Sequence, residues 1–269
     1  GAKGGFVSGA FFQQGERVVT GSSDNIARVW DAKTGKELFQ LKDTGFNGCY
    51  VSASSDGKTI LTTNTPYVKL WDGKTGQELM DLTDDVGLKS HWPFPFLGTF
   101  SPDGRKLITC ACPKGGLQTV FKLNIRDVET GKVLSTMKGQ DYWTNCSAFS
   151  HDGARVATGS ETIDDVARVW ETETGAELFA FRGNGGSVWS VCFSPDDRML
   201  AIGGQDGKIR LQDLTTGKEF RTLKGLSRVV TSVSFSPDGK WILAGSQDNT
   251  ARMWDVASGS EIEIGRAHV

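Results

Sequence analysis

The sequence predicts an all-β protein made of six copies of one repeat, and two observations carry this prediction. Each copy contains a short alternating run that ends in a Trp–Asp pair or a close variant, and a glycine follows four residues after the acid. Successive glycines are separated by 41, 55, 44, 42 and 42 residues, and this period is typical of repeat architectures. The glycines are Gly35, Gly76, Gly131, Gly175, Gly217 and Gly259.

The sixth copy contains four predicted strands, named A to D here. Four apolar or alternating runs, 229–235, 241–246, 250–254 and 261–264, are separated by polar turns typical of antiparallel hairpins. The turn after strand A is Ser236-Pro237-Asp238-Gly239, in which Pro fixes φ, Asp bonds nearby backbone and Gly accepts positive φ. A four-stranded sheet of this size cannot bury both faces alone, so it must stack on its neighbours.

Composition excludes several classes of partner and location. The 269 residues carry a net charge of −2, which gives no basic footprint for nucleic acid or an anionic membrane. No apolar run approaches the ~18 residues that a membrane helix needs, and no signal-peptide pattern is present. Scattered cysteines in apolar strand patterns are expected to be buried free thiols of a reducing compartment, which predicts a cytoplasmic protein. They are Cys49, Cys110, Cys112, Cys146 and Cys192.

Four motif elements occur together at fixed offsets along the whole chain. These are the Phe-Ser-Pro-Asp-Gly turn, an Asp six residues before the strand-C Trp position, the Trp–Asp pair and a following Thr-Gly. In this combination the chain resembles the WD-repeat β-propeller family, and in particular a bacterial-type WD-repeat domain. The resemblance implies four-stranded antiparallel blades arranged radially around a central channel, with strand A innermost.

The resemblance predicts one propeller domain over residues 1–269. Its six blades are expected at about 1–41, 42–82, 83–136, 137–181, 182–223 and 224–264. Residues 6–12 already supply the first strand A and 261–264 the last strand D, so we expect the ring to close without a swapped strand. Alternatively, the chain is a fragment of a larger propeller, because Gly265 to His268 resembles the Gly-His link between blades.

Two sets of repeated residues are expected to be structural. The first set is strand-C tryptophans that pack between blades: Trp30, Trp71, Trp170 and Trp254. The second set is aspartates that accept bonds from the backbone of their own turns: Asp24, Asp164, Asp206 and Asp248. The family histidine that completes a buried network with Asp and Trp is replaced by Thr44, Asp85, Gln140, Asn184 and Leu226. We therefore expect the full network to be absent.

Catalytic signatures are missing from the sequence. It has no Gly-x-Ser-x-Gly, His-Glu-x-x-His or Cys-x-x-Cys motif and no complete phosphate-binding loop. Its three histidines, His91, His151 and His268, are too scattered to indicate a metal site or triad, and His151 is expected to face solvent. The sequence therefore predicts no catalytic residue, no metal, no cofactor and no enzyme activity.

The resemblance implies a non-catalytic scaffold that binds a protein or peptide at the channel mouth. A hydrolase with acids at the channel mouth and a structural spacer of a larger signalling protein are the alternatives. The sequence predicts no nucleic-acid or membrane partner and leaves the oligomeric state open.

The predicted contact surface lies where strand A begins, beside blades three to five. Positions four and six residues before the strand-A aromatic should face the axis near its rim, joined by the preceding loops and the residues before the turn aspartates. Trp, Tyr and Arg around a concavity dominate interface hot spots. An alternative is that Phe94, Phe96 and Trp189 fill the channel or the core between blades. The predicted partner-binding residues are Trp92, Phe94, Tyr142, Trp143, Asn145, Trp189, Gln205, Arg228 and Gln247.

Overall fold

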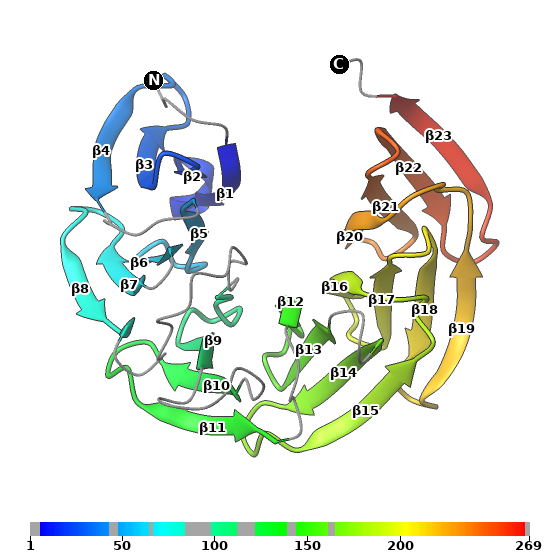
Figure 1. Ribbon diagram of the computed structural model, residues 1–269. Coiled ribbons are helices and arrows are strands. Elements are labelled where there is room, and N and C mark those ends of the chain that lie inside the picture. Colours follow the sequence, from blue (N-terminus) through cyan, green and yellow to red (C-terminus); the bar gives the residue numbers. More distant parts are fainter. Residues whose placement is uncertain are drawn as a thin grey trace. The chain divides into compact units, whose positions relative to one another are not determined.

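The computed structural model describes residues 6–42, 48–64, 67–83, 98–111, 122–138, 144–160 and 165–266. Within these ranges the strands β1 to β23 form six antiparallel sheets (Figure 1). The sheets confirm the prediction of an all-β fold made of propeller blades. The chain divides into two compact units, 1–141 and 142–269. A single domain over the whole chain and closure of the ring remain predictions.

The first unit contains blades one to three, whose strands lie side by side in chain order. In blade three the described residues form three strands, and a single bridge between Phe100 and Leu107 stands at the position of strand A. A short 3-10 turn, η1 (Gln13–Gly15), follows the first strand. The strands are β1 (Phe6–Phe12), β2 (Arg17–Ser22), β3 (Ile26–Asp31), β4 (Glu37–Lys42), β5 (Tyr50–Ala53), β6 (Thr59–Asn64), β7 (Tyr67–Asp72), β8 (Glu78–Asp81), β9 (Lys106–Ala111), β10 (Lys122–Asp127) and β11 (Val133–Met137).

The second unit contains blades four to six, each with four strands in the order A to D. The four strands of blade six begin and end within two residues of the bounds predicted for the sixth copy. The strands are β12 (Thr144–Phe149), β13 (Arg155–Ser160), β14 (Val166–Glu171), β15 (Glu177–Arg182), β16 (Val188–Phe193), β17 (Met199–Gly204), β18 (Ile209–Asp213), β19 (Lys218–Leu223), β20 (Val230–Phe235), β21 (Trp241–Ser246), β22 (Thr250–Asp255) and β23 (Glu261–Arg266).

Each blade packs on its neighbour through two different faces. We name the face that packs on the following blade the trailing face, and the face that packs on the preceding blade the leading face. Between blades four and five, apolar side chains of both faces form one buried cluster, and each large side chain contributes roughly 1.5–3 kcal/mol. The trailing face supplies Ala157, Ala167 and Val169, and the leading face supplies Val191, Phe193 and Leu200.

The same arrangement recurs at the other described contacts between blades within each unit. In blade five, which packs on both blade four and blade six, strands B and C are enclosed on both faces, so β17 reads as a nearly continuous apolar run and is buried at five of its six residues. Strand D forms the outer edge, and only the last residue of β19 is buried. Burial on two faces therefore determines which strands are apolar throughout.

The strand-C tryptophans also make a polar contact. The indole Nε1 of Trp170 donates to Thr158 Oγ1 in strand B at 2.9 Å, and Trp30 and Trp71 donate to Thr20 and Thr62 at 2.8 Å. Thus part of the family network is present even though the histidine is not.

Blade three keeps this contact with a different residue. Arg126 stands at the tryptophan position, is 2% exposed, and its Nε donates to Thr109 Oγ1 at 3.0 Å. In blade six the threonine position holds Ala244, and the indole of Trp254 donates instead to the carbonyl oxygen of Lys224 at 3.2 Å. The repeat therefore preserves a donor at this position more closely than it preserves a tryptophan.

The described cysteine side chains are free thiols in or beside the cores between blades. Cys49 and Cys146 are buried, whereas Cys192 is partly exposed. Burial raises the pKa of Cys146 to about 12 and also raises that of Cys192. These thiols are therefore poor nucleophiles at neutral pH. The Cys110 side chain and all of Cys112 lie outside the described residues.

Candidate interaction site

A β-bulge recurs where strand A begins. In blades four, five and six the pairing with strand B skips one strand-A residue, so two residues of strand A oppose one of strand B. Blade one has the same irregularity after Phe6. A bulge re-aims the side chain of the extra residue. In the second unit the extra residues are Asn145, Trp189 and Thr231.

The bulge brings Trp189 to the surface. On a regular strand Trp189 would share one face with Val191 and Phe193, because side chains alternate with a period of two. Val191 and Phe193 are 7% and 2% exposed against blade four, whereas Trp189 is 37% exposed. Trp189 therefore does not join the core between blades that its spacing in the sequence would suggest.

The bulged residues of the second unit lie on adjacent strands. β16 contacts both β12 and β20, so these three first strands form the inner edge of the unit. Asn145 Nδ2 donates to the carbonyl oxygen of Val188 at 3.2 Å, and the backbone N–H of Val233 donates to Ser190 Oγ at 3.0 Å. Asn145, Trp189 and Thr231 therefore form a row, which we name the inner row.

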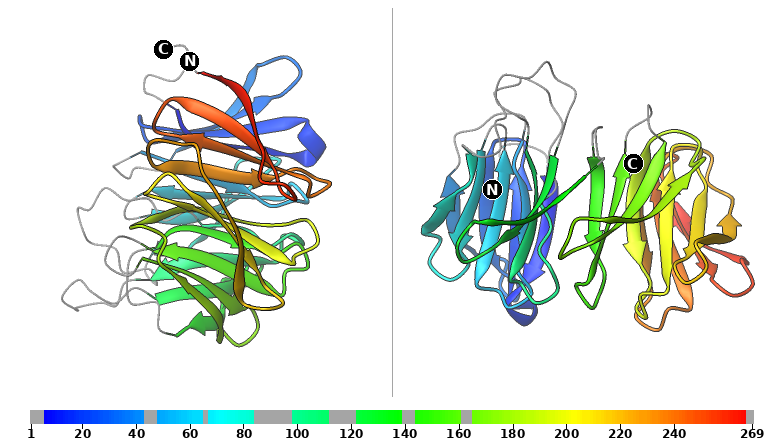
Figure 2. Two further views of the ribbon diagram at one scale, coloured as in Figure 1. Left: turned by 90° about the vertical axis from the view of Figure 1, so that its right-hand side faces the viewer. Right: turned by 90° about the horizontal axis from the view of Figure 1, so that it is seen from below.

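Two turns stand beside the inner row. In blade five the turn between strands B and C is hydrogen-bonded to the loop that precedes strand A. The N–H of Gln205 donates to the Ser187 carbonyl, and the N–H of Ser187 donates to Gln205 Oε1 at 3.1 Å. In blade six the N–H of Gln247 donates to the Val229 carbonyl at 3.0 Å. Because strands in this unit run between two common ends, these turns and the start of strand A lie at the same end (Figure 2).

The exposed side chains of this region define one surface. Gln205, Gln247 and Arg228 are exposed, Thr231 is exposed, and Asn145 is half-buried. We name this surface the inner rim, consisting of Asn145, Trp189, Gln205, Arg228, Thr231 and Gln247. Five of these are partner-binding residues predicted from the sequence. Thr231 belongs to the same set because it stands four residues before the strand-A aromatic, as Asn145 and Trp189 do.

Other predicted residues fall elsewhere or are not described. Trp92, Phe94, Tyr142 and Trp143 lie outside the described residues, and so does Asp164. The predicted turn bonds of the remaining aspartates are present. Asp24 accepts from the N–H of Ile26, and Asp206 and Asp248 accept from the N–H groups of Lys208 and Thr250.

An ion pair between the buried Arg210 and the partly buried Asp206 lies beside Gln205 of the inner rim. Arg210 is 8% exposed and donates to both carboxylate oxygens of Asp206, at 3.2 and 2.8 Å. Its Nη1 also lies 3.3 Å from the carbonyl oxygen of Asn184 in the loop before β16. Burial raises the pKa of Asp206, but hydrogen bonds from Arg210 and Lys208 outweigh it and hold this pKa at about 2. The pair therefore ties the B–C turn of blade five to the loop that precedes Trp189.

Replacing Asp206 with asparagine is expected to destabilise the protein at pH 7 by on the order of 1–2 kcal/mol. The carboxyl has a lower pKa when folded than its ordinary value of 3.8, so its contribution is complete above pH 4. The contribution is lost as pH falls toward the folded pKa of about 2. Urea unfolding at pH 7, 4 and 2.5 measures the difference between wild type and Asp206→Asn. A difference that stays constant down to pH 2.5 would contradict this assignment.

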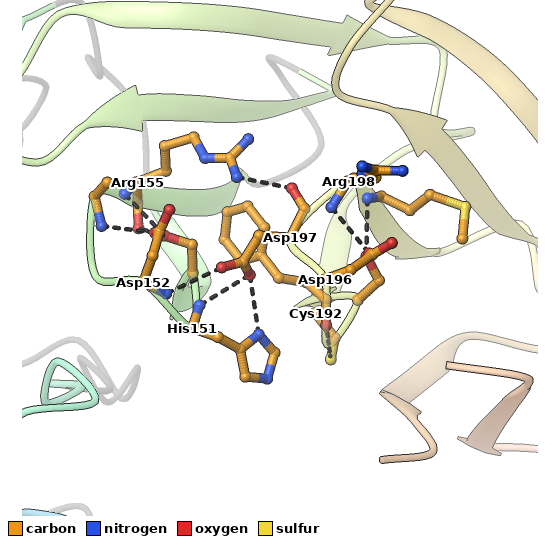
Figure 3. A network of polar contacts seen from close by, with 12 residues as sticks. His151, Asp152, Arg155, Cys192, Asp196, Asp197 and Arg198 are labelled. Atoms are coloured by element: carbon orange, nitrogen blue, oxygen red, sulfur yellow. Dashed lines mark hydrogen bonds and ion pairs between the residues drawn. The ribbon is translucent and has the colours of Figure 1, made fainter. Parts of the chain in front are cut away.

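A second polar cluster joins blades four and five at the A–B turns (Figure 3). Asp197 occupies the last turn position, where the other turns have glycine, with φ of 56°. Its carboxylate accepts from the N–H groups of His151 and Asp152 at 2.9 and 3.0 Å, and His151 Nδ1 lies 2.9 Å from Oδ1. Arg155 Nη2 donates to the Asp197 carbonyl at 2.7 Å.

This cluster is relevant to the hydrolase alternative because it contains a histidine and carboxylates, which are residue types that hydrolases use. Figure 3 also shows Cys192 in this region. The Asp197 oxygens are occupied by two backbone N–H groups and the His151 ring. The Cys192 thiol donates to the Phe193 carbonyl at 3.3 Å, and burial raises its pKa. These contacts hold two turns together rather than activate a nucleophile. The sequence placed the His151 ring in solvent, where it is 57% exposed, but did not indicate its contact with Asp197.

Replacing Asp197 with glycine is expected to destabilise the protein by about 1–2 kcal/mol, although glycine adopts positive φ more readily. The loss arises because two backbone N–H groups of the neighbouring turn lose their acceptor. Asp197→Asn keeps one side-chain oxygen and tolerates this φ, so it should cost less than the glycine variant. Chemical unfolding of the three proteins makes the comparison. Greater stability of Asp197→Gly than of wild type would mean that backbone strain outweighs the hydrogen bonds.

Within the described ranges, no group of three or more His, Cys, Asp or Glu residues is placed to hold a metal ion. The same part of the chain contains no helix with the length and apolar character needed to cross a membrane.

The repeated antiparallel blades, in which a strand-C Trp or Arg donates a hydrogen bond to a strand-B threonine, define this chain as a β-propeller protein built from repeats. The family described as WD domain, G-beta repeat (WD40) matches residues 2–31, 131–171, 175–213 and 217–255, which is more than half of the chain. The chain therefore belongs to the WD40 repeat family.

Two relatives are similar over parts of their length. WD repeat-containing protein SL1-17 of Schistosoma mansoni is 30% identical over 199 residues, which cover 73% of this chain and 61% of that protein. Autophagy-related protein 16 of Arabidopsis thaliana is 33% identical over 96 residues, which cover 34% of this chain and 18% of that protein. The chain thus spans less than two thirds of the length of either relative.

Proposed function

We propose that the protein is a non-catalytic scaffold that binds a peptide or protein segment at the inner rim of blades four to six. The observation that carries the proposal is the exposed indole of Trp189, which a bulge turns away from the core between blades. Repeat proteins of this family generally act as protein-interaction scaffolds, and this supports the choice of a protein partner.

The chemistry of the inner rim suits an extended peptide. Trp189 offers a large apolar surface, and tryptophan and arginine are enriched among the residues that dominate binding energy. Asn145, Gln205 and Gln247 carry amides, which both donate and accept hydrogen bonds as a peptide backbone does. Arg228 adds one exposed positive charge beside them. A segment with an apolar or aromatic side chain and free backbone groups would match this set.

The proposal includes a cytoplasmic location, and it competes with two alternative functions, a hydrolase and a structural spacer. Free buried thiols at Cys49 and Cys146 support a reducing compartment such as the cytoplasm. The hydrolase alternative would need an activated group, and the contacts of the His151–Asp197 cluster favour a joining role. The spacer alternative predicts that no partner is bound by the rim.

Selection of displayed peptides against the whole chain, followed by affinity measurement of a recovered peptide, tests the proposal. Trp189→Ala should weaken binding by about 30-fold, which corresponds to ~2 kcal/mol at a hot spot. Phe220→Ala is the matched control, because Phe220 is 49% exposed on the outer strand β19. The melting temperatures of both variants should match that of the wild-type protein. Equal affinity of wild type and Trp189→Ala for every recovered peptide would place the site elsewhere.

A further inference from the structure

The segment that carries Arg228 is tied to the B–C turn of blade six by successive hydrogen bonds. The N–H of Ser227 donates to the Asp248 carboxylate at 2.9 Å, and the Arg228 carbonyl accepts from Ser246 Oγ at 3.2 Å. The next carbonyl along the chain accepts from the N–H of Gln247 at 3.0 Å. These bonds hold the backbone from which the Arg228 side chain projects.

The hairpin formed by strands B and C of blade five lies against the same segment. Gly207 in its turn has φ of 75°, and a Cβ there would lie 2.9 Å from the Arg228 carbonyl oxygen. In strand B of this hairpin, a Cβ at Gly203 would lie 2.9 Å from Val230 Cγ1 of blade six. Strand A of blade five pairs with Gly203 at the residue that follows Trp189. Arg228 and Trp189 are therefore both adjacent to one hairpin.

The charged side chains at the B–C turns of blades five and six already have partners. Asp206 pairs with both basic side chains of residues 206–210, at 2.8 and 3.0 Å. Asp248 accepts from the N–H and the hydroxyl of Thr250 and from the N–H of Ser227. Burial raises the pKa of Asp248, but its hydrogen bonds outweigh this effect and hold the pKa at about 2. Both carboxylates are therefore ionised at neutral pH and engaged within the protein.

The guanidinium of Arg228 differs from these groups. Arg228 is exposed, and in the part of the chain that the structure describes no acceptor lies within hydrogen-bonding distance of its guanidinium. A guanidinium presents its N–H donors in a planar fork that matches the two oxygens of a carboxylate. The inner rim therefore combines the exposed indole of Trp189 with one positive charge that has no acceptor.

We propose that the segment bound at the inner rim is acidic, and that an Asp or Glu side chain of this segment pairs with Arg228 while an apolar side chain contacts Trp189. This inference rests on the proposed function and adds the class of partner. Charge complementarity selects the occupant, because the free cation lies beside the apolar contact. A carboxylate suits the site better than a phosphate, because phosphate is typically bound by several arginines and the ionised Asp206 and Asp248 would repel its second charge.

Selection of a displayed random-peptide library against the full chain tests the pairing. Peptides recovered by the wild-type protein should be enriched in Asp and Glu, whereas those recovered by Arg228→Glu should be enriched in Lys and Arg. Arg198→Glu is the matched control. Arg198 is also exposed, but it precedes β17 and so lies at the opposite end of that strand from Gln205. Its recovered peptides should remain acidic.

Affinities of one recovered peptide isolate the contribution of the charge pair. Replacing the acidic residue of the peptide with its amide should weaken binding to the wild-type protein by about 10-fold. The same replacement should change binding to Arg228→Gln by less than about 2-fold, because the cation is already absent. Raising the NaCl concentration should weaken binding to the wild-type protein more than binding to Arg228→Gln, because salt screens an exposed pair.

The outcomes separate this inference from the proposed function on which it rests. If Trp189→Ala weakens binding and Arg228→Gln does not, the acidic partner is wrong and the peptide site stands. Unchanged affinity of Trp189→Ala, or a library that yields no binder, would overturn the proposed function and this inference with it. Tighter binding when phosphoserine replaces the acidic residue of the peptide would overturn the carboxylate assignment and identify a phosphate site.

Discussion

Gly21→Ala is expected to prevent stable folding of the first unit, at a cost of at least about 3 kcal/mol. Gly21 lies in strand B of blade one, and a Cβ there would overlap the backbone carbonyl oxygen of Cys49. That carbonyl belongs to the segment leading into blade two, and the N–H of Cys49 donates to the Ser22 carbonyl at 3.0 Å. A backbone atom held in this way cannot move aside as the end of a side chain can.

The matched control is Gly245→Ala, at the same position in blade six. The nearest atom to a Cβ there is Ser232 Oγ at 3.0 Å, the end of a small side chain that can rotate. We expect a change within about 1 kcal/mol for this variant. Circular dichroism and urea unfolding of both variants measure the contrast. Similar stability of the two variants would mean that the approach of blade two to blade one is not rigid.

Trp170→Ala should destabilise the second unit by about 3–5 kcal/mol. Trp170 has no exposed surface, and its removal leaves a large cavity in blade four. It also removes the donor to Thr158 Oγ1, which is buried. Trp189→Ala is the control of the same chemistry, because Trp189 is 37% exposed and its loss should change stability by less than about 1 kcal/mol. Chemical unfolding followed by circular dichroism measures both variants.

A double-mutant cycle separates packing from hydrogen bonding at this site. Trp170→Phe removes the N–H but keeps most of the apolar volume, and Thr158→Val removes the acceptor. Thr158→Val alone should cost about 1–3 kcal/mol, because it leaves a buried indole N–H unpaired. In the Trp170→Phe background the same change should cost less. Strictly additive effects would show that the hydrogen bond adds nothing to the packing of Trp170.

Much of the fold follows from local sequence. Alternation of apolar residues, Ser-Pro-Asp-Gly turns and the forty-residue period depend on neighbours within one repeat, and each can be read without knowing which blades touch. The strands of the sixth copy accordingly lie within two residues of their predicted bounds. The turn bonds of Asp206 and Asp248 were predictable for the same reason, since donor and acceptor are two residues apart.

The candidate site was predicted only in part. The offset of four residues before the strand-A aromatic identified Asn145 and Trp189, but simple alternation would have placed Trp189 on the buried face beside Phe193. A bulge depends on how strand A pairs with strand B, and one strand alone does not reveal that pairing. The exposure of Trp189 is thus a property of the paired strands.

Contacts between blades were decided by tertiary structure alone. His151 and Asp197 are 46 residues apart, and their contact exists because two A–B turns meet at one end of adjacent sheets. Arg126 takes the place of a tryptophan because a buried threonine of the neighbouring strand needs only a donor. The sequence by itself determined the repeat and its strands, because their signals are local. Stacking of the sheets decided which side chains are buried, paired or exposed, because these properties depend on residues distant in the chain.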